Sequence, residues 1–272
     1  MEQSKLGRTG IHLCVSNSVA NFTEKILKNL QLPEWKWWQV KKPVLFIGMY
    51  NWTDYLKFLW HRGEKTIFWC GSDIKNLNWF WARFFRKARN ICENEIEQSH
   101  LAKFGIRAGI KPMFFGNVND FPISFKPSKN PQVFLCAHSK REEEYGVYII
   151  EKIAPRFPEI TFHIYGIKGE NKNNIVYHGL VSEEQFNREI KDYQVGLRLN
   201  EFDGFSEVLA KSALLGQYPI SRIYYPFIDY AKKPKDLFKY LNMLKYKKRP
   251  NYKASEFWRK KLCEHLLLAK EK

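Results

Sequence analysis

The chain lacks the cysteine pattern of a disulfide-rich or zinc-binding protein. Its 272 residues include only five cysteines, which stand far apart at positions 14, 70, 92, 136 and 263. An odd number of cysteines without a C-x-x-C pair predicts neither a disulfide framework nor a structural zinc site, so we expect a reducing, cytoplasmic location. No H-x-x-x-H pair or acidic cluster at ligand spacing occurs either, and we therefore predict no metal and no cofactor.

Long apolar runs are also missing. No stretch of about 18 or more apolar residues occurs, which is the length that a membrane-spanning helix needs. The first ten residues, MEQSKLGRTG, are polar and do not resemble a secretory signal. Any contact with a membrane is therefore expected to be peripheral.

Acidic residues are scarce relative to basic ones. The chain has 45 Lys and Arg against 28 Asp and Glu, a formal net charge of +17 and a pI near 9.6. Such a surplus favours a polyanionic partner, namely nucleic acid, an anionic membrane or a phosphorylated substrate, although a lysine-rich solvated surface is the simpler alternative. The 44% of hydrophobic residues excludes a disordered chain and predicts a substantial core.

The first half of the chain alternates short apolar runs with helical patterns. The longest helical pattern places apolar residues at helical spacing from Leu77 to Ile91, with basic residues on the remaining face. The first forty residues carry no clear pattern, and their cluster W35KWW38 fits a strand, the core or the surface. The expected elements are strands at 43–49, 66–70 and 109–115 and helices at 53–61, 75–91 and 101–104.

A segment rich in proline, residues 117–131, predicts a linker, after which the alternation resumes. In one of the helices that follow, Ser182 is the expected N-cap and Gln185 completes a capping box. From about residue 235 the chain reads as helices with the basic run 245–253 between them. The expected elements are strands at 133–137, 160–165, 175–177, 194–199 and 218–221 and helices at 142–154, 183–191 and 205–215.

Strand–helix alternation in both halves predicts α/β architecture, with two Rossmann-like domains whose parallel sheets face a cleft. The expected domains are residues 1–128, residues 129–235, and C-terminal helices at 236–272 that pack back on the first domain. In parallel sheets of this kind, ligands bind at the carboxyl ends of strands, where helix N-termini also point. The residues that follow each strand are therefore the candidates for a site.

The stretch after the strand at 194–199 is the most suggestive of these candidates. Gly204 permits close approach of the backbone to a ligand at a helix start, and Asp203 can accept hydrogen bonds from sugar hydroxyls. A plain Asp-Gly turn followed by a helix cap fits the same residues. In the first half, Asp73 at a strand end either orients or deprotonates an acceptor, or caps a helix.

Four stretches in a fixed order resemble the GT-B glycosyltransferases of the group 1 type. In chain order, the first three are FLCAHSKREEEYG (134–146), FPEITFHIYG (157–166) and VYHGLVSEEQF (176–186). The fourth consists of a strand, the motif Arg-x(4)-Asp-Gly-Phe-Ser that begins at Arg198, a helix and Ala-x-x-Gly. The segment WCGSDI (69–74) is similar to one in small relatives, and the resemblance spans roughly residues 43–221.

The resemblance implies a retaining transfer without a metal, in which basic side chains stabilise the leaving diphosphate. It places a nucleotide-diphosphate sugar on the second domain, as a co-substrate, and an acceptor on the first. The candidate catalytic residues are Asp73, from its position at a strand end, and Asp203, which the resemblance implies. The implied donor-binding residues are Ser139, Lys140, Arg141, Gly166, His178, Gly179, Arg198, Gly204, Phe205, Ser206 and Lys211.

One position departs from the family. Its members carry two acidic residues eight positions apart, the first for the donor sugar and the second for the ribose. Asp203 takes the first position, but Lys211 stands at the second, and an ammonium group cannot accept a hydrogen bond. Either the ribose is held otherwise, or Lys211 contacts phosphate, or the donor differs.

The acceptor and the charge leave alternatives open. A glycan, a lipid-linked molecule or a polysaccharide fits as acceptor, and the basic face at 75–91 with Trp79 fits either an anionic membrane surface or the core. Peripheral binding to the inner face of a membrane is therefore one expectation. The alternatives are a DNA-modifying glycosyltransferase of the same fold and a non-catalytic protein that binds nucleotide sugars or nucleic acid.

Overall fold

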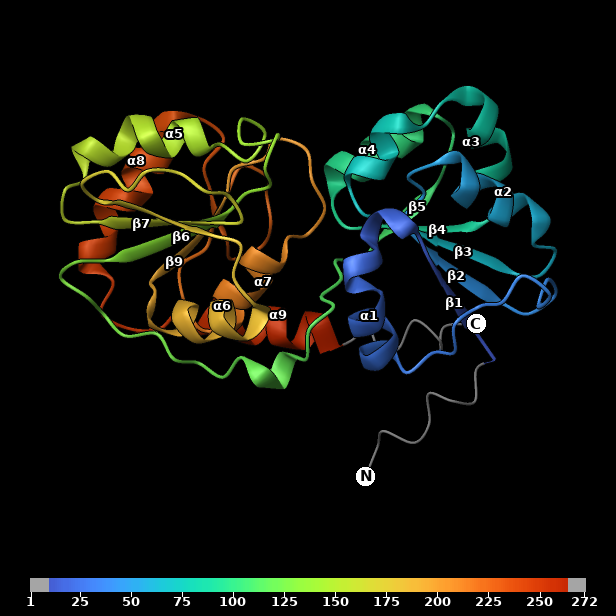
Figure 1. Cartoon of the computed structure of the whole chain (residues 1–272), viewed down its shortest axis with the longest axis horizontal. Helices are drawn as coiled ribbons and strands as arrows, with labels where there is room; N and C mark the ends of the chain where they lie inside the picture. Colours follow the sequence, from blue (N-terminus) through green and yellow to red (C-terminus); the bar gives the residue numbers. More distant parts are fainter. Residues whose placement is uncertain (1–9, 264–272) are drawn as a thin grey trace. The chain divides into compact units, whose positions relative to one another are not determined.

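The structure is a computed structural model that describes residues 10–263 and contains two compact units, each built on its own parallel sheet (Figure 1). Among the described residues, unit 1 comprises 10–117, Phe202–Phe205 and 261–263, and unit 2 comprises Val118–Glu201 and Ser206–Lys260. Of the predicted C-terminal helices, the part up to Lys260 belongs to unit 2, and residues 264–272 lie outside the described residues.

The sheet of unit 1 has five parallel strands whose order in space, β1-β2-β3-β4-β5, is their order in the chain. Apolar side chains fill both of its faces, so that Phe46 packs on one side and Ile47 on the other. The strands are β1 (His12–Val15), β2 (Val44–Ile47), β3 (Lys65–Phe68), β4 (Arg89–Cys92) and β5 (Ala108–Ile110).

Helices cover both faces of this sheet. Helix α1 (Thr23–Leu30) packs on one face through Ile26 and Leu30. Helices α2 (Trp52–Trp60), α3 (Trp79–Phe85) and α4 (Glu95–Lys103) cover the other face. Asn51 starts α2 with a reciprocal capping box to Asp54, so the sequence itself fixes where this helix begins.

The single helix predicted over residues 75–91 is wrong. The structure has a 3₁₀ helix at Ser72–Asn76, an extended Leu77, then α3 and strand β4. Asn78 begins α3 as its N-cap, and Asn90 donates from Nδ2 to the carbonyl oxygens of Phe85 and Ala88, which closes the turn into β4. Pairing of β4 with β3 outweighs the local helical pattern.

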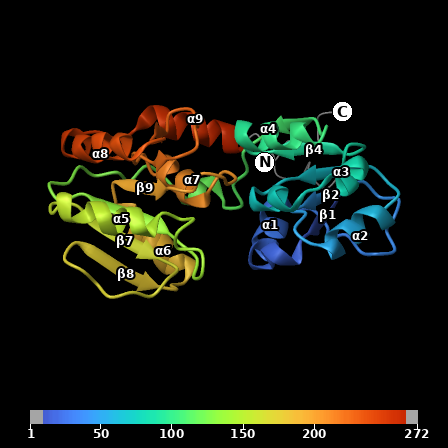
Figure 2. The same ribbon diagram turned by 90° about the horizontal axis from the view of Figure 1, so that it is seen from above.

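The sheet of unit 2 has six parallel strands in the order β11-β10-β9-β6-β7-β8. The order therefore reverses between β6 and β9, which are paired neighbours. Figure 2 shows β8 at one edge of the sheet beside β7. The strands are β6 (Gln132–Cys136), β7 (Thr161–Tyr165), β8 (Ile175–Gly179), β9 (Val195–Arg198), β10 (Ile220–Ser221) and β11 (Asp229–Tyr230).

Helices also cover both faces of the second sheet. Helices α5 (Val147–Ile153) and α8 (Pro234–Met243) pack on one face, and α6 (Glu183–Glu189) and α7 (Glu207–Leu214) lie on the other (Figure 1). Ser182 caps α6 by accepting from the backbone N–H of Gln185, as predicted, whereas the Gln185 side chain bonds Glu189. The last described helix is α9 (Tyr252–Cys263).

The predicted fold class is confirmed by these two parallel α/β units. The apolar runs at 43–49, 66–70, 133–137 and 160–165 all contain buried strands. Strand β1 and helix α1 fall in the N-terminal part that carried no clear sequence pattern. In the same part, Trp35 is buried, whereas Trp37 and Trp38 are exposed. Among the residues that the structure describes, no helix is both long and apolar enough to cross a bilayer.

Candidate functional site

The reversal of strand order in unit 2 marks the best place for a ligand. Where neighbouring parallel strands send their connections to opposite faces, a crevice opens beyond the carboxyl ends of the strands. In unit 2 these strands are β6, which ends at Cys136, and β9, which ends at Arg198. The predicted donor residues 139–141 directly follow the first of these ends.

Two of the predicted basic residues meet at this edge. The guanidinium carbon of Arg198 lies 4.5 Å from the centre of the Tyr145 ring, and that of Arg141 lies 5.7 Å from the same centre. Arg141 also donates to the Glu144 carboxylate at 2.5 Å. The structure therefore brings Arg141 and Arg198 onto one aromatic ring, although 57 positions separate them in the sequence.

Lys140 and Ser139 lie in the exposed turn between β6 and α5. Lys140 has a positive φ of 69°, a left-handed conformation that a turn imposes. Its backbone N–H donates to the Glu142 carboxylate at 3.1 Å. The turn thus presents its lysine side chain to solvent beside Arg141.

The Cys136 thiol, at the end of β6, is surrounded by charged side chains that affect its pKa. Burial raises the pKa of Cys136 to about 12, the nearby Arg198 and Lys211 act to lower this pKa, and Glu207 acts to raise it. A thiol with such a pKa is neutral at physiological pH. It therefore serves as a small packing group among charged neighbours rather than as a nucleophile.

Lys211 is buried, with only 2% of its surface exposed. Its ammonium nitrogen lies 3.1 Å from Oε1 of Glu183 and 3.3 Å from Oε2 of Glu207. The Phe186 ring lies under the same group at 5.2 Å. Lys211 thus joins the start of α6 to the start of α7 through two carboxylates.

Helix α7 begins at this edge of the sheet. Ser206 is its N-cap, and the Ser206 hydroxyl accepts from the backbone N–H of Val208 at 3.2 Å. The first turn of a helix carries partial positive charge and backbone donors, which favour an anion. The predicted position of Ser206 at a helix start is therefore reproduced.

The glycines at the ends of β7 and β8 have a packing role. Gly166 has a φ of 90°, and a Cβ at this position would lie 2.1 Å from the carbonyl oxygen of Ala137. Its N–H donates to the carbonyl oxygen of Gly179 at 2.7 Å, and Gly179 has a φ of 67°. Only glycine fits at position 166, because the backbone of the neighbouring strand end is too close.

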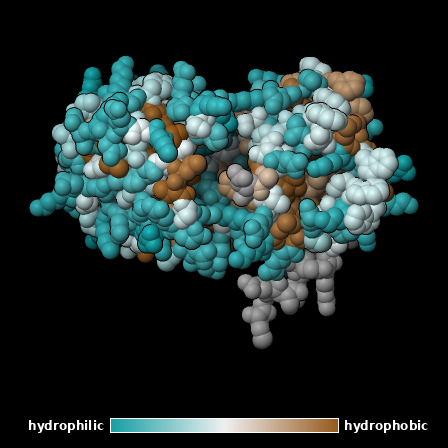
Figure 3. All heavy atoms as spheres, viewed as in Figure 1, coloured by the Kyte–Doolittle hydropathy of each residue, from teal (hydrophilic) through white to brown (hydrophobic). Residues whose placement is uncertain are grey.

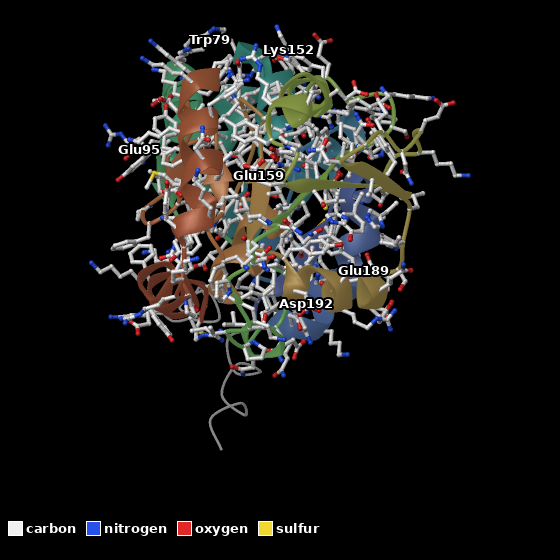
Figure 4. The ribbon with its side chains drawn as sticks, turned by 90° about the vertical axis from the view of Figure 1, so that its left-hand side faces the viewer. Trp79, Glu95, Lys152, Glu159, Glu189 and Asp192 are labelled. Carbon is white, nitrogen blue, oxygen red and sulfur yellow. The ribbon has the colours of Figure 1, made fainter. Side chains whose placement is uncertain are left out.

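His178 belongs to a network between the sheet and α6. Its ring stacks on Tyr165 at 4.2 Å, and its Nε2 lies 2.9 Å from Nδ1 of His163. Burial lowers the pKa of His163 to about 4 and lowers that of His178 in the same way. Glu189, labelled in Figure 4, accepts from the Tyr165 hydroxyl at 2.6 Å and lies 3.8 Å from His178.

A cavity of about 630 Å³ opens elsewhere in unit 2, between α5 and the loop that follows β7. None of the predicted donor residues lines it. Its polar side chains include Glu142, Glu151 and Lys172, of which Lys172 and Glu151 form an ion pair at 3.0 Å.

In unit 1, the predicted catalytic residue Asp73 is fully buried at the end of β3. Its carboxylate accepts from the backbone N–H groups of Met49 and Cys70, both at 3.0 Å, and therefore ties the ends of β2 and β3 together. Burial raises the pKa of Asp73 to about 6, although the two backbone donors oppose this shift.

Two buried glutamates, Glu93 and Glu97, interact electrostatically with Asp73, and sequence analysis did not suggest either of them. Glu97 on α4 accepts from the backbone N–H of Glu93 at 2.6 Å, and Glu93 accepts from the N–H groups of Met113 and Phe205, both at 3.0 Å. Burial raises the pKa of each glutamate well above its ordinary value. The place of Glu93 directly after β4 was the available signal, but the helix predicted over 75–91 concealed that strand.

The loop at Phe202–Phe205, which belongs to unit 1, closes over this carboxylate pair. The carbonyl oxygen of Asp203 accepts from the side chain of Asn94 at 2.7 Å. A Cβ at Gly204 would lie 1.9 Å from Oε2 of Glu93. The buried Glu93 therefore requires a glycine here, which is a reason within the protein that differs from the predicted approach of a ligand.

Among residues 10–263, no group of three or more His, Cys, Asp or Glu side chains has an arrangement that could hold a metal ion. No family model matches the chain, and no curated protein sequence does. Solved structures do match. Sucrose-phosphate synthase from Thermosynechococcus elongatus has a TM-score of 0.60 at 10% identity, over 83% of this chain and 71% of its own.

Two further solved structures are similar. The lipopolysaccharide outer core galactosyltransferase WaaB has a TM-score of 0.58 at 13% identity, over 91% of this chain and 77% of its own. The pneumococcal O-GlcNAc transferase GtfA, in complex with UDP and GlcNAc, has a TM-score of 0.56 at 15% identity, over 82% of this chain. The chain has the GT-B fold. It spans little more than half of GtfA, whose coverage is 55%.

Within this GT-B chain, the sequence-predicted donor residues fall into three groups. Arg141, Arg198 and the start of α7 gather around the strand reversal of unit 2. Gly166 and His178 pack inside unit 2, and Gly204 and Phe205 belong to unit 1. The structure adds Tyr145, Glu183 and Glu207, which sequence analysis did not name.

Proposed function

We propose that this chain is a glycosyltransferase that moves a sugar from a nucleotide-diphosphate sugar to an acceptor, and that unit 2 binds the donor. The observation that carries the proposal is the convergence of Arg141 and Arg198 on Tyr145, at the reversal of strand order. Similarity to solved GT-B glycosyltransferases, one of them in complex with UDP, supports the same conclusion.

The two arginines would bind the diphosphate. Guanidinium groups donate to phosphate oxygens in pairs and stay charged at every physiological pH. Contact with the Tyr145 ring limits the motion of both side chains, so less conformational entropy is lost when phosphate binds. Charge that develops on the leaving diphosphate would then be stabilised without a metal ion, aided by the N-terminus of α7.

Lys211 suggests how a ribose would be held in place of the glutamate that relatives carry. Its ammonium group already lies between two carboxylates, which leaves it poorly placed to bind phosphate. Glu207 stands one helical turn earlier on α7, and its side chain is 25% exposed. We therefore assign the acceptor of the ribose hydroxyls to Glu207, with Lys211 as the residue that positions it.

The carboxylates of unit 1 have separate proposed roles. Asp73 is buried and tied to two backbone donors, so it is a positioning residue rather than the group that deprotonates an acceptor. Asp203 stays the candidate for contact with the donor sugar, because it occupies the first acidic position of the motif that resembles the family. Retention of configuration and a glycan or lipid-linked acceptor belong to the same proposal.

Calorimetry with nucleoside diphosphates, in the presence of EDTA, tests the donor site. Arg141→Ala and Arg198→Ala should each weaken binding about 10- to 100-fold, the loss expected for a hydrogen bond to a charged group. Arg188→Ala, an exposed arginine on α6, is the matched control and should bind as the unaltered chain does. If all three variants bind nucleoside diphosphates as tightly as the unaltered chain does, Arg141 and Arg198 do not form the diphosphate site.

Turnover of labelled nucleotide sugars tests the reaction itself. Release of the sugar, or its transfer to a glycan, should persist in excess EDTA and fall in the Arg198→Ala variant. Activity that EDTA abolishes and magnesium or manganese restores would show that the basic side chains do not replace a metal. Diphosphate binding without any turnover would favour the non-catalytic alternative.

A further inference from the structure

Unit 1 exposes a set of large apolar side chains on α2 and on the segment that precedes β2. Trp37, Trp52 and Trp60 keep 67%, 66% and 57% of their surface exposed. The set is called the aromatic face below. Its members are Trp37, Trp38, Trp52, Leu56, Leu59 and Trp60.

The aromatic face is continuous. The Trp37 and Trp38 rings meet edge to face at 5.8 Å, and Nε1 of Trp60 donates to the carbonyl oxygen of Trp37 at 3.2 Å. A depression of about 560 Å³ is lined by Trp37, Leu56, Lys57, Leu59 and Trp60. In Figure 3, pale and brown side chains gather on the right-hand side of unit 1, where Figure 1 places α2.

The position of these residues on α2 shows that folding does not bury them. Asp54, Tyr55 and Phe58 turn toward the sheet, whereas Trp52, Leu56 and Leu59 recur on the opposite side at helical spacing. The four tryptophans leave roughly 500 Å² exposed, at the upper end of what isolated proteins show. An apolar patch of this size indicates an interaction surface.

Basic residues outnumber acidic ones in the segment that carries the aromatic face. Residues 34–65 contain six Lys and Arg and three Asp and Glu, and one of these acids, Glu34, pairs with Lys36. A second acid, Asp54, is buried and accepts hydrogen bonds from Ser16, Tyr50 and Asn51. Lys57 lies within the depression itself. The surface that a partner meets therefore combines exposed apolar side chains with a lysine, in a segment of positive net charge.

This charge pattern decides between two occupants. A second copy of the chain, related by a two-fold axis, would bring two segments of positive net charge together and enclose the Lys57 side chains, at a cost in free energy. An anionic lipid surface instead receives tryptophan rings at the level of the headgroups and lets the lysine ammonium groups reach lipid phosphates. The second arrangement satisfies both the rings and the charges.

We infer that the aromatic face docks unit 1 onto an anionic membrane surface. The tryptophans enter the interface between headgroups and acyl chains, and Lys57 binds the headgroups together with other basic residues of the same segment. Helix α3 lies beside α2 (Figures 1 and 2), where Trp81 packs against Tyr55, and it carries the exposed Phe80, with the Arg83 guanidinium 4.2 Å from the Phe80 ring. The docking surface therefore centres on α2 and not on a helix over 75–91.

Flotation of the full chain with vesicles tests this inference without any donor or acceptor. Vesicles that contain phosphatidylglycerol should carry the protein, and the double variant Trp37→Ser/Trp38→Ser should bind at least about tenfold more weakly. The control is Tyr224→Ser/Tyr246→Ser, which removes two exposed aromatic residues from unit 2 and should bind as the unaltered chain does. Circular dichroism verifies that both double variants are folded.

Three results would overturn the inference. One is vesicle binding that both double variants retain in full and that salt alone removes, since this identifies a purely electrostatic contact. Another is self-association that the Trp37→Ser/Trp38→Ser variant abolishes, with no vesicle binding, since this identifies a second copy as the occupant. Absence of both kinds of binding is the third. Lower vesicle binding in the tryptophan variant alone supports the docking surface, whatever the outcome of the diphosphate experiments.

Discussion

Units 1 and 2 are built from the same kind of parallel sheet but use its carboxyl edge in opposite ways. In unit 2 the strand order reverses, and basic side chains gather at the reversal. In unit 1 the strands follow chain order without a reversal, and the same edge holds the buried carboxylates of Asp73, Glu93 and Glu97. The comparison shows that two sheets of the same type place opposite charges at their carboxyl edges, arginines in unit 2 and carboxyl groups in unit 1.

The largest effect on stability is expected from a change at Lys211, the buried lysine of unit 2. Lys211→Glu should lower the free energy of unfolding by about 3 kcal/mol, because the new carboxylate meets those of Glu183 and Glu207 without a cation. Urea unfolding measures the loss. The control Lys191→Glu changes an exposed lysine and should stay within about 0.5 kcal/mol of the unaltered chain. Equal stability of the two variants would contradict a buried, paired Lys211.

A smaller loss of stability is expected from a change at Gly204, in the loop over the buried carboxyl groups of unit 1. Gly204→Ala should cost about 1–3 kcal/mol, because the added Cβ displaces the Glu93 carboxylate from its bonds to Met113 and Phe205. Gly109→Ala is the matched control, since nothing lies within 4 Å of a Cβ there. If Gly204→Ala is as stable as the control, Glu93 does not fill the space that the structure assigns to it.

The carboxylate pair of unit 1 predicts a dependence on pH. A carboxyl with a raised pKa binds more protons in the folded chain than in the unfolded one, so stability falls as pH rises above about 4.3, its ordinary pKa. Glu97→Gln removes this loss, and Oε1 of Glu97 has no hydrogen-bond partner among the described residues that the change would break.

Urea unfolding between pH 4 and pH 8 gives the difference in stability between Glu97→Gln and the unaltered chain. This difference should grow in favour of the variant as pH rises, whereas it should stay flat for the exposed Glu95→Gln. The depressed pKa of His163 acts in the opposite direction but is common to all three proteins, so it cancels. A flat difference for Glu97→Gln would refute the raised pKa.

The smallest effect concerns the N-cap of α7, at the carboxyl edge of the sheet in unit 2. Ser206→Ala should lower stability by about 1 kcal/mol, because the backbone N–H of Val208 loses its acceptor. Ser206→Asp keeps an acceptor and should recover most of the loss. Thermal unfolding of the two variants provides the comparison, and equal melting temperatures would show that the cap contributes nothing.

The sequence predicted those parts of both units that local residues determine. Ser182 caps α6, and apolar runs between turn residues became buried strands. It failed where long-range pairing decides, because β4 forms only beside β3 and the apolar spacing around it also fits a helix. The polar Asn78 and Asn90, which end up as a helix cap and a turn closure, were the warning within that pattern.

The residues of the candidate site could also be predicted only in part, because some depend on local sequence and others on long-range contacts. Arg141 and Arg198 could be predicted, since Arg141 lies shortly after one strand and Arg198 at the end of another, but their meeting at Tyr145 depends on which strands are neighbours. The pairing of Lys211 with Glu183 joins two helices that are distant in sequence. Glu93 was hidden because the strand that positions it was predicted to be helical.

The buried ammonium group of Lys211 constrains how this protein can change by mutation. Its two partners lie on separate helices, so a reversal of charge at position 211 keeps full stability only when Glu183 and Glu207 change as well. A variant with glutamate at 211 should therefore need neutral or basic residues at both other positions to recover the lost stability. Changes at the three positions are coupled, because glutamate at 211 alone is opposed by the two carboxylates that remain.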